Sequence, residues 1–372
     1  MSLWWYLLVP RLDGWFKWTI CPGVFLVVAE YRGGLGAWPR MLVLWLVLDW
    51  LIYAARYQWN DIRGYANDLA HVHAARRTRL PAAAGGGAGH RHVVLSRGVL
   101  ALRLALALAA AALVGDLTMG AVLLAGVFGT AGVYEWMRSR GAVTAVWLLI
   151  GTGYGIRAVT GAYAAGVPLA SAASLAIFAY FAAVGAMFCL LSWALDATSH
   201  DGAPAPVRAR YLASKPHVAH LLHYTAPDPG GGRVLLGRGR VIAPWNVAVL
   251  VAAGTGPAVG VAIAGPVPMA VLALVTLVSL LGAGVLVAAQ GSVARGMVTV
   301  VVGVALAAAG VLLDTGTVVA VILPWGLLAI SYTGLRASSY TAIKRPPRQW
   351  LTRLSSAHRP TAELSRGHLP LG

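Results

Sequence analysis

Uncharged apolar stretches, each about the length of a membrane-spanning helix, recur along most of the 372-residue sequence. A helix needs about 20 apolar residues to cross the hydrocarbon core of a bilayer. The stretches are rich in Ala, Leu, Val and Gly and lack period-two alternation, which favours helices over a β-barrel. We predict spans at residues 16–31, 40–57, 96–115, 117–136, 142–164, 168–195, 242–264, 266–289, 296–313 and 315–335. The expected fold is all-α, a polytopic transmembrane helical bundle of nine to ten spans.

The composition fits a bilayer better than a soluble core. Hydrophobic residues make up 59% of the chain and charged residues 11%, whereas a soluble domain carries roughly a quarter charged residues. A net charge of +17 would also suit nucleic acid. The basic residues, however, lie in connections between apolar stretches, as the positive-inside rule describes. We therefore expect contact with membrane lipid and no nucleic-acid binding. Cys21 and Cys189 give neither a disulfide framework nor a metal-ligand spacing.

The distribution of Lys and Arg predicts the orientation of the bundle. The long connections 56–97 and 196–241 and the tail are basic, whereas the short connections near residues 115, 165, 265 and 314 carry no Lys or Arg. The connection between the first and second spans, which is expected on the outer side, departs from this pattern because it carries Arg32 and Arg40. We expect both termini and the basic connections to be cytoplasmic, which favours ten spans over nine. The chain then comprises one transmembrane domain, 1–340, and a basic tail, 341–372. Its Arg- and Ala-rich, Lys-poor composition is typical of a GC-rich bacterium and hence of a plasma membrane.

A polar segment directly after the second span is the best candidate for a functional site. Asn60, Gly64 and Asp68 are four residues apart and share a helical face, and Asp61 lies seven residues before Asp68 on nearly the same face. Carboxylate and amide oxygens at the mouth of a bundle suit Mg²⁺. Three arginines follow at once, namely Arg76, Arg77 and Arg79. Because arginine binds phosphate bidentately, the segment indicates a metal–diphosphate site. For Arg91 and Arg97 we expect only a contribution to orientation.

This segment resembles the first aspartate-rich motif of the UbiA superfamily of intramembrane prenyltransferases, Asn-Asp-x-x-Asp-x-x-x-Asp followed by a basic stretch and Arg-Pro. Asn60, Asp61 and Asp68 match the motif, and Arg79-Leu-Pro81 stands in place of Arg-Pro. Gly64 replaces the middle aspartate, which removes one expected Mg²⁺ ligand. The resemblance implies that Asn60, Asp61 and Asp68 hold Mg²⁺, and that Asn60 and the three arginines bind the substrate.

Three further matches follow in the order of the family. Residues 10–17 look like its N-terminal Arg-Pro…Trp…Lys segment, which implies a substrate-binding role for Lys17. Tyr134-Glu-Trp-Met-Arg138 resembles its Tyr-x-x-x-Lys motif; the alternative is a pair of interfacial anchors. Residues 155–161 resemble an Arg-x-x-x-Gly helix, with Arg157 as a substrate-binding residue. Because Arg157 lies inside an apolar stretch, it either lines a cavity or pairs with a carboxylate.

A second polar cluster follows the sixth span. The family places an Asp-x-x-x-Asp there that binds another Mg²⁺, and this chain has Asp196, His200 and Asp201. The resemblance implies Asp196 and Asp201 as metal ligands, although His200 occupies the expected second position. Lys215 is either a phosphate contact or a solvated loop residue.

The resemblance implies Mg²⁺-dependent transfer of a prenyl group from a prenyl diphosphate to an unidentified acceptor, in an apolar central cavity open to lipid. The implied catalytic residues are Asp61, Asp68, Asp196, Tyr134 and Arg138. Aromatic faces stabilise a carbocation, and the candidates by position are Tyr57, Trp59, Tyr65, Tyr134 and Trp136. One alternative is a UbiA-type terpene cyclase, which needs no acceptor. Another is a non-enzymatic transporter or lipid-binding membrane protein, but we find no matched pair of broken helices in two halves.

Overall fold

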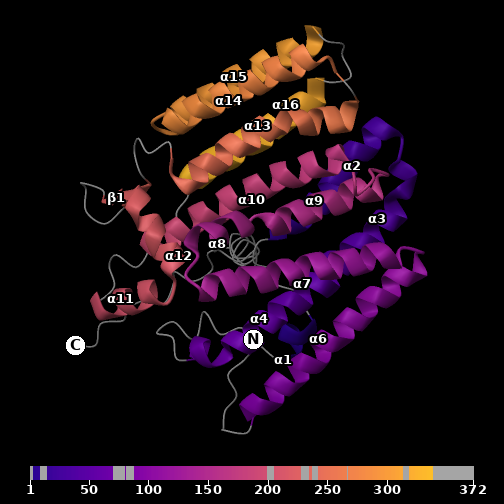
Figure 1. The fold of residues 1–372 in the computed structure, drawn as a ribbon, viewed down its shortest axis with the longest axis vertical. Coiled ribbons are helices and arrows are strands. Elements are labelled where there is room, and N and C mark those ends of the chain that lie inside the picture. The colour runs from indigo at the N-terminus through magenta and orange to yellow at the C-terminus, as the bar shows by residue number, and fades with distance from the viewer. Residues whose placement is uncertain are drawn as a thin grey trace, which may run out of the picture.

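The computed structural model describes residues 3–8, 15–69, 80, 88–198, 205–227, 234–236, 242–265, 267–312 and 318–337. Long helices run side by side along the molecule, and the chain crosses from one end to the other at each turn (Figure 1). Within the described ranges, eight helices are long and apolar enough to span a membrane. The chain is therefore a multi-pass, all-α membrane protein, as predicted. The cytoplasmic orientation, the plasma membrane and the central cavity stay predictions.

Each predicted span has a helical counterpart in the structure. The second span is a continuous helical run of α3 (Trp38–Trp45), the π-helix η3 (Leu46–Ile52) and α4 (Tyr53–Leu69). The fifth span is divided into α8 (Val143–Leu149) and α9 (Thr152–Ala164). The remaining long helices are α6 (Ala88–Leu113), α7 (Leu117–Ser139), α10 (Ala172–Thr198), α13 (Pro244–Ala264), α14 (Met269–Ala288), α15 (Ser292–Leu312) and α16 (Val318–Ala337).

The first predicted span is the exception in length. It consists of a 3-10 turn, η1 (Trp15–Thr19), followed by α2 (Ile20–Arg32), which has 13 residues. Pro22 lies in the first turn of α2, where a missing backbone N–H is tolerated. Gly33 ends the helix in the left-handed region with φ of 68°, a conformation that glycine adopts without strain. A further 3-10 turn, η2 (Leu35–Ala37), leads into α3.

Short elements outside the predicted spans were not predicted from the sequence. They are α1 (Leu3–Leu8), α11 (Ala205–Ala213), α12 (Pro216–Ala219), the 3-10 turn η4 (His220–Tyr224), and the strands β1 (Thr225–Pro227) and β2 (Val234–Leu236). The two strands pair antiparallel, with Thr225 opposite Leu236. α11, α12 and β1 lie together at one end of the bundle (Figure 1). They are too short to give a periodic apolar pattern.

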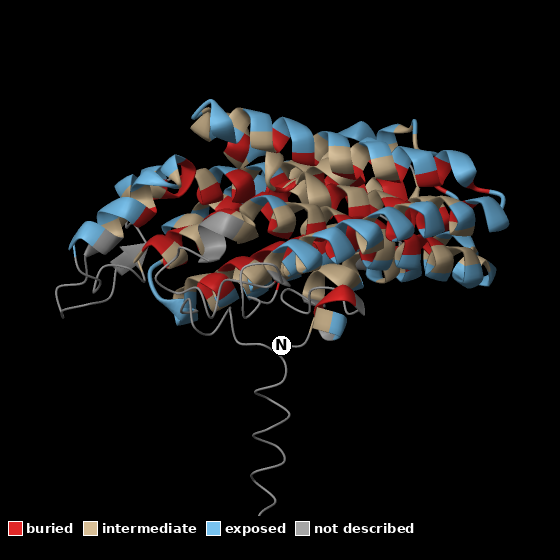
Figure 2. Cartoon of the chain, turned by 90° about the horizontal axis from the view of Figure 1, so that it is seen from below, coloured by how far each residue is buried: buried red, intermediate tan, exposed pale blue. Residues whose placement is uncertain are grey.

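The most buried helices are α10 and α13. In the most apolar stretch of each of these two helices, half or more of the residues are buried, compared with 17% in α6 and α15. Exposed residues cover the outer faces of the bundle (Figure 2), and they include large apolar side chains such as Val300 and Val301. Apolar outer faces are expected where a helix meets lipid.

Glycines allow α9 to pack closely against its neighbours. A Cβ atom at Gly161 would overlap the backbone carbonyl of Cys21 in α2. A Cβ atom at Gly151, at the break between α8 and α9, would overlap the carbonyl of Ala182 in α10. Small residues at helix crossings let backbones approach closely in membranes. The position of α9 between α2 and α10 therefore depends on these glycines.

We expect Gly161→Ala to lower the free energy of unfolding by about 1–3 kcal/mol, because the added methyl overpacks a backbone contact. The matched control is Gly129→Ala in α7, where a Cβ atom meets nothing within 4 Å. The control should be neutral or slightly stabilising, because Ala is the better helix former. Thermal unfolding in detergent measures both. Equal melting temperatures for the two variants would contradict the close packing.

Candidate functional site

Polar side chains gather where α4, α7 and α10 end; we call this region, which carries Asp61, Arg138 and Asp196, the polar end. Arg63 of α4 approaches Glu135 of α7, with 3.9 Å between Nη1 and Oε2. The α11–α12 segment lies at the same end as the termini of these helices (Figure 1). Motifs that are far apart in the sequence therefore lie at one end of the bundle.

His217 in α12 contacts both α8 and α10. Its ring makes an edge contact with Trp193 of α10, with 4.9 Å between ring centroids. Its backbone carbonyl accepts a hydrogen bond of 2.8 Å from Nε1 of Trp147 in α8. Arg138 of α7 acts electrostatically on the His217 ring. α12 thus packs against the ends of both α8 and α10.

Asp61 is buried at the polar end, with 7% of the residue exposed. Its carboxylate accepts a hydrogen bond of 3.4 Å from the Tyr6 hydroxyl of α1. Asn60, the preceding residue, is half-buried and lies about 100° away around α4. Asp68 lies on the same helix, but its side chain is outside the described residues, so its expected position on the Asp61 face stays a prediction.

Within the Tyr134–Arg138 motif, Glu135 is a carboxylate that was not predicted to take part in the site. Tyr134 is buried, and Arg138 forms an ion pair of 3.0 Å with Glu135 one turn earlier. Glu135 also lies near Arg63. The Arg138 side chain is 46% exposed, so it can reach a ligand outside the helix. A pair of arginines beside one carboxylate leaves a net positive charge here.

Asp196 is held by the segment that follows α10. Its carboxylate accepts a hydrogen bond of 2.5 Å from the Tyr211 hydroxyl of α11. Lys215 Nζ lies 3.7 Å from the same carboxylate oxygen and 4.6 Å from the centre of the Tyr211 ring. Lys215 is therefore an ion-pair partner of Asp196. Tyr211 was missed because its contact with Asp196 depends on how α11 folds back.

The predicted metal ligands are only partly described. No group of three or more His, Cys, Asp or Glu side chains suited to a metal occurs within the described part of the chain. Asp61 and Asp196 each accept a hydrogen bond from a different tyrosine. The side chain of Asp68 and the residues Arg76, Arg77, Arg79, His200 and Asp201 lie outside the described set. Mg²⁺ binding therefore stays a prediction.

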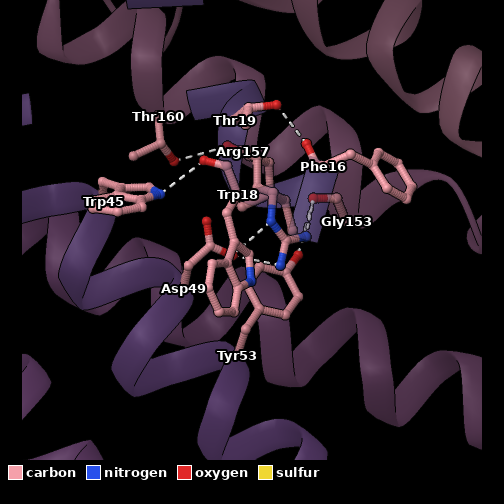
Figure 3. A network of polar contacts seen from close by, with 10 residues as sticks. Phe16, Trp18, Thr19, Trp45, Asp49, Tyr53, Gly153, Arg157 and Thr160 are labelled. Atoms are coloured by element: carbon pink, nitrogen blue, oxygen red, sulfur yellow. Dashed lines mark hydrogen bonds and ion pairs between the residues drawn. The ribbon is translucent and has the colours of Figure 1, made fainter. Parts of the chain in front are cut away.

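Between the membrane faces, Arg157 of α9 pairs with Asp49 of η3 (Figure 3). Asp49 Oδ1 accepts a hydrogen bond of 2.7 Å from Nε, and Nη2 lies 2.6 Å from the same oxygen in the ion pair. The two side chains are 3% and 0% exposed. Of the two alternatives for Arg157, pairing with a carboxylate is confirmed. Single π-helical turns within α-helices frequently occur at functional sites.

The pair has a shell of aromatic and backbone groups. The Arg157 guanidinium lies 3.6 Å from the Tyr53 ring centre, and its Nη1 donates to the Gly153 carbonyl at 3.0 Å. The Tyr53 hydroxyl donates to the same carbonyl at 3.1 Å. The second Asp49 oxygen, Oδ2, is buried and has no hydrogen-bond partner among the described residues. The shell therefore stabilises the cation more fully than the carboxylate.

Lys17 of η1 is a second cation near this pair. Its ammonium acts electrostatically on Asp49 and lies 5.3 Å from the centre of the Tyr154 ring. Trp45 Nε1 of α3 donates to the Trp18 carbonyl at 2.9 Å, which holds η1 against α3 (Figure 3). Lys17 and Arg157, two predicted substrate-binding residues, thus lie in one interior cluster with Asp49.

Comparisons with protein-family models, with curated proteins and with solved structures found no match for this chain. Its function must therefore be inferred from the residues and their geometry.

We expect Asp49→Leu to lower the free energy of unfolding by about 3–5 kcal/mol, because Arg157 would remain buried without a counter-charge. The double variant Asp49→Leu/Arg157→Met should recover most of this loss, because it removes both charges. As a control, Glu135→Gln removes a partly exposed ion pair and should cost no more than about 1 kcal/mol. Unfolding in detergent measures all three. A double variant as unstable as the single one would contradict this account.

Burial lowers the pKa of His217, the nearby Arg138 and Lys215 add to this effect, and together they bring the pKa to about 4. Between pH 6.5 and 4 the unfolded chain therefore binds a proton that the folded chain does not. The free energy of unfolding should therefore decrease as the pH is lowered through this window, by at most about 2 kcal/mol between pH 6.5 and 5. In His217→Phe this dependence should weaken, whereas His90→Phe, which replaces an exposed histidine, should keep it. Melting temperatures across this range test the expectation.

Proposed function

We propose that this chain is a membrane-embedded, Mg²⁺-dependent prenyltransferase of the UbiA type, which transfers a prenyl group from a prenyl diphosphate to an acceptor. The observation that carries the proposal is the gathering of Asp61, Arg138 and Asp196 at one end of an apolar bundle. An amphiphilic substrate with an anionic head and an isoprenoid tail fits such a surface. The head would lie at the polar end and the tail among the apolar helices.

The basic residues of the polar end would bind the diphosphate. Arg138 is half-exposed and shares Glu135 with Arg63, so positive charge remains for phosphate oxygens. Lys215 lies beside Asp196 and supplies another cation. Neutralising the diphosphate favours cleavage of the allylic carbon–oxygen bond, with both electrons leaving on the diphosphate.

Asp61 and Asp196 have the chemistry of Mg²⁺ ligands, because this ion prefers carboxylate oxygens and keeps part of its coordination for phosphate and water. A bound Mg²⁺ would supply further charge neutralisation of the leaving group. Asn60 offers an amide oxygen beside Asp61 on α4. These residues fit the ion by donor type.

Aromatic rings at the polar end would stabilise positive charge on the allylic carbon. Trp59 packs against Phe128 of α7, with 6.2 Å between ring centroids, and Tyr57 lies one turn along α4 from Tyr53. Tyr134 is buried at the end of α7. Burial excludes water, so that the acceptor rather than water attacks the carbon and loses its proton.

A terpene cyclase is the second candidate, because aromatic rings extend deeper into the bundle. Phe16, Tyr154 and Phe188 form a cluster with ring centroids 4.5–6.3 Å apart. Rings along the path of an isoprenoid chain would stabilise a cation that migrates before it is quenched.

We expect purified protein to release diphosphate from one of a panel of prenyl diphosphates when Mg²⁺ is present, and EDTA to abolish the release. Asp61→Asn and Asp196→Asn should each lower kcat by about 100-fold or more. The matched control is Asp116→Asn, because Asp116 lies at the opposite end of the bundle, where Arg40 and Tyr163 bind its carboxylate. This variant should keep activity if it remains folded.

Product analysis separates the two enzymes. A prenylated acceptor supports the transferase, and a cyclised hydrocarbon or alcohol formed without acceptor supports the cyclase. Wild-type turnover in Asp61→Asn and Asp196→Asn would overturn the assigned site. Absence of diphosphate release from every substrate would contradict both enzymes and favour a transporter or lipid-binding protein.

A further inference from the structure

Two arginines lie where α15 begins and α16 ends. Arg295 is the fourth residue of α15, and Arg336 is the last but one of α16. The Arg336 guanidinium carbon lies 5.9 Å from the centre of the Tyr332 ring, and both arginines act electrostatically on the Tyr332 hydroxyl. The two cations therefore converge on one tyrosine.

Arg295 is buried, and no carboxylate pairs with it in the described part of the chain. Only 7% of the residue is exposed. Its Nη1 donates to the Ala289 carbonyl at 3.3 Å, and its buried Nε has no acceptor in the described part of the chain. The sequence has no Asp or Glu from 229 to 313 or from 315 to 337. A buried cation without a counter-charge is strongly unfavourable, and a bound anion would relieve this cost.

Hydrogen bonding and burial hold the residues around the two arginines in place. Tyr332 is 1% exposed, and its hydroxyl donates to Asn246 Oδ1 of α13 at 2.9 Å, which fixes the ring between the arginines and α13. The N-terminus of α15 adds the positive end of a helix dipole. An anion that enters here would meet two guanidinium groups.

The position of the site favours a lipid over a soluble anion. Val293 and Met297 are 75% and 60% exposed, and they lie on the outer face of α15, about 160° around the helix from Arg295. The helix that carries the buried arginine therefore presents an apolar surface on its other side. α15 and α16 are separated from α4 and α7 by α10 and α13 (Figure 1). The arginine site therefore lies away from Asp61 and Arg138 and shares no residue with the polar end.

We propose that Arg295 and Arg336 bind the phosphate of an anionic phospholipid headgroup at the membrane surface. Guanidinium groups bind phosphate oxygens bidentately, and basic pockets between transmembrane helices bind anionic headgroups. The acyl chains then lie against the apolar outer face of α15, where Val293 and Met297 are exposed. This site does not depend on the proposed enzymatic activity.

The test uses delipidated full-length protein in a neutral maltoside detergent. Thermal unfolding is measured with increasing short-chain phosphatidylglycerol, with phosphatidylcholine of the same chain length, and with inorganic phosphate. Phosphatidylglycerol should raise the Tm more than either of the others at equal concentration. Each of Arg295→Gln and Arg336→Gln should weaken its apparent affinity by about fivefold, and the double variant by about 30-fold, at about 1 kcal/mol for each cation.

The matched control is Arg97→Gln, an exposed arginine near the start of α6, which should keep wild-type affinity for phosphatidylglycerol. A second readout needs no ligand. Arg295→Met should raise the Tm of the delipidated protein, because it removes an unpaired buried charge, whereas loss of a purely structural arginine would lower it. If Arg295→Gln does not fold, Arg336→Gln provides the affinity measurement.

Three results would overturn the proposal. Equal stabilisation by phosphatidylglycerol and phosphatidylcholine would show that the site does not select an anion. An equal loss in Arg97→Gln would show that general surface charge is responsible. Inorganic phosphate as effective as phosphatidylglycerol would assign the arginines to a soluble phosphate and exclude the lipid.

Discussion

The buried ion pair between Asp49 and Arg157 is the constraint on which the arrangement of the site depends. Two charges in the hydrocarbon layer are costly unless they meet with good geometry, so η3 and α9 must keep their relative height and rotation. Tyr53 follows Asp49 by one turn and stacks on the same guanidinium. Tyr57 and Asp61 follow along α4 at helical spacing. Fixing the pair therefore also fixes which way the polar end of α4 faces.

The positions of the long helices could be predicted because apolar stretches bounded by basic connections are a strong signal. The short helices in the connections could not, since α11 and α12 have 9 and 4 residues and show no sustained periodicity. The π-helical turn was also missed, because its apolar residues match an ordinary helix. The order of the main helices was predicted, whereas eight helices of the described residues, rather than nine or ten, are long and apolar enough to span a membrane.

For the candidate site, the sequence identified the functional side chains more readily than the side chains that contact them. Arg157 was recognised because a charge in an apolar stretch is costly, and the same rule would have found Asp49 in the 40–57 stretch. Tyr6 and Tyr211 could not be paired with Asp61 and Asp196, because those contacts join segments whose folding is not visible in a local pattern. Whether the polar end binds Mg²⁺ and a diphosphate stays a prediction.

The π-helical segment η3 sets the helical phase between α3 and α4. A π turn holds more residues than an α turn, so the faces of α3 and α4 are offset from those of one uninterrupted α-helix. Each residue of an α-helix advances the phase by about 100°. Deleting one residue between Leu46 and Leu48 would thus turn the contacts of Trp45 with Trp18 away from those of Asp49 with Arg157. Apart from Asp49, this part of the chain is therefore more tolerant of substitution than of a change in length.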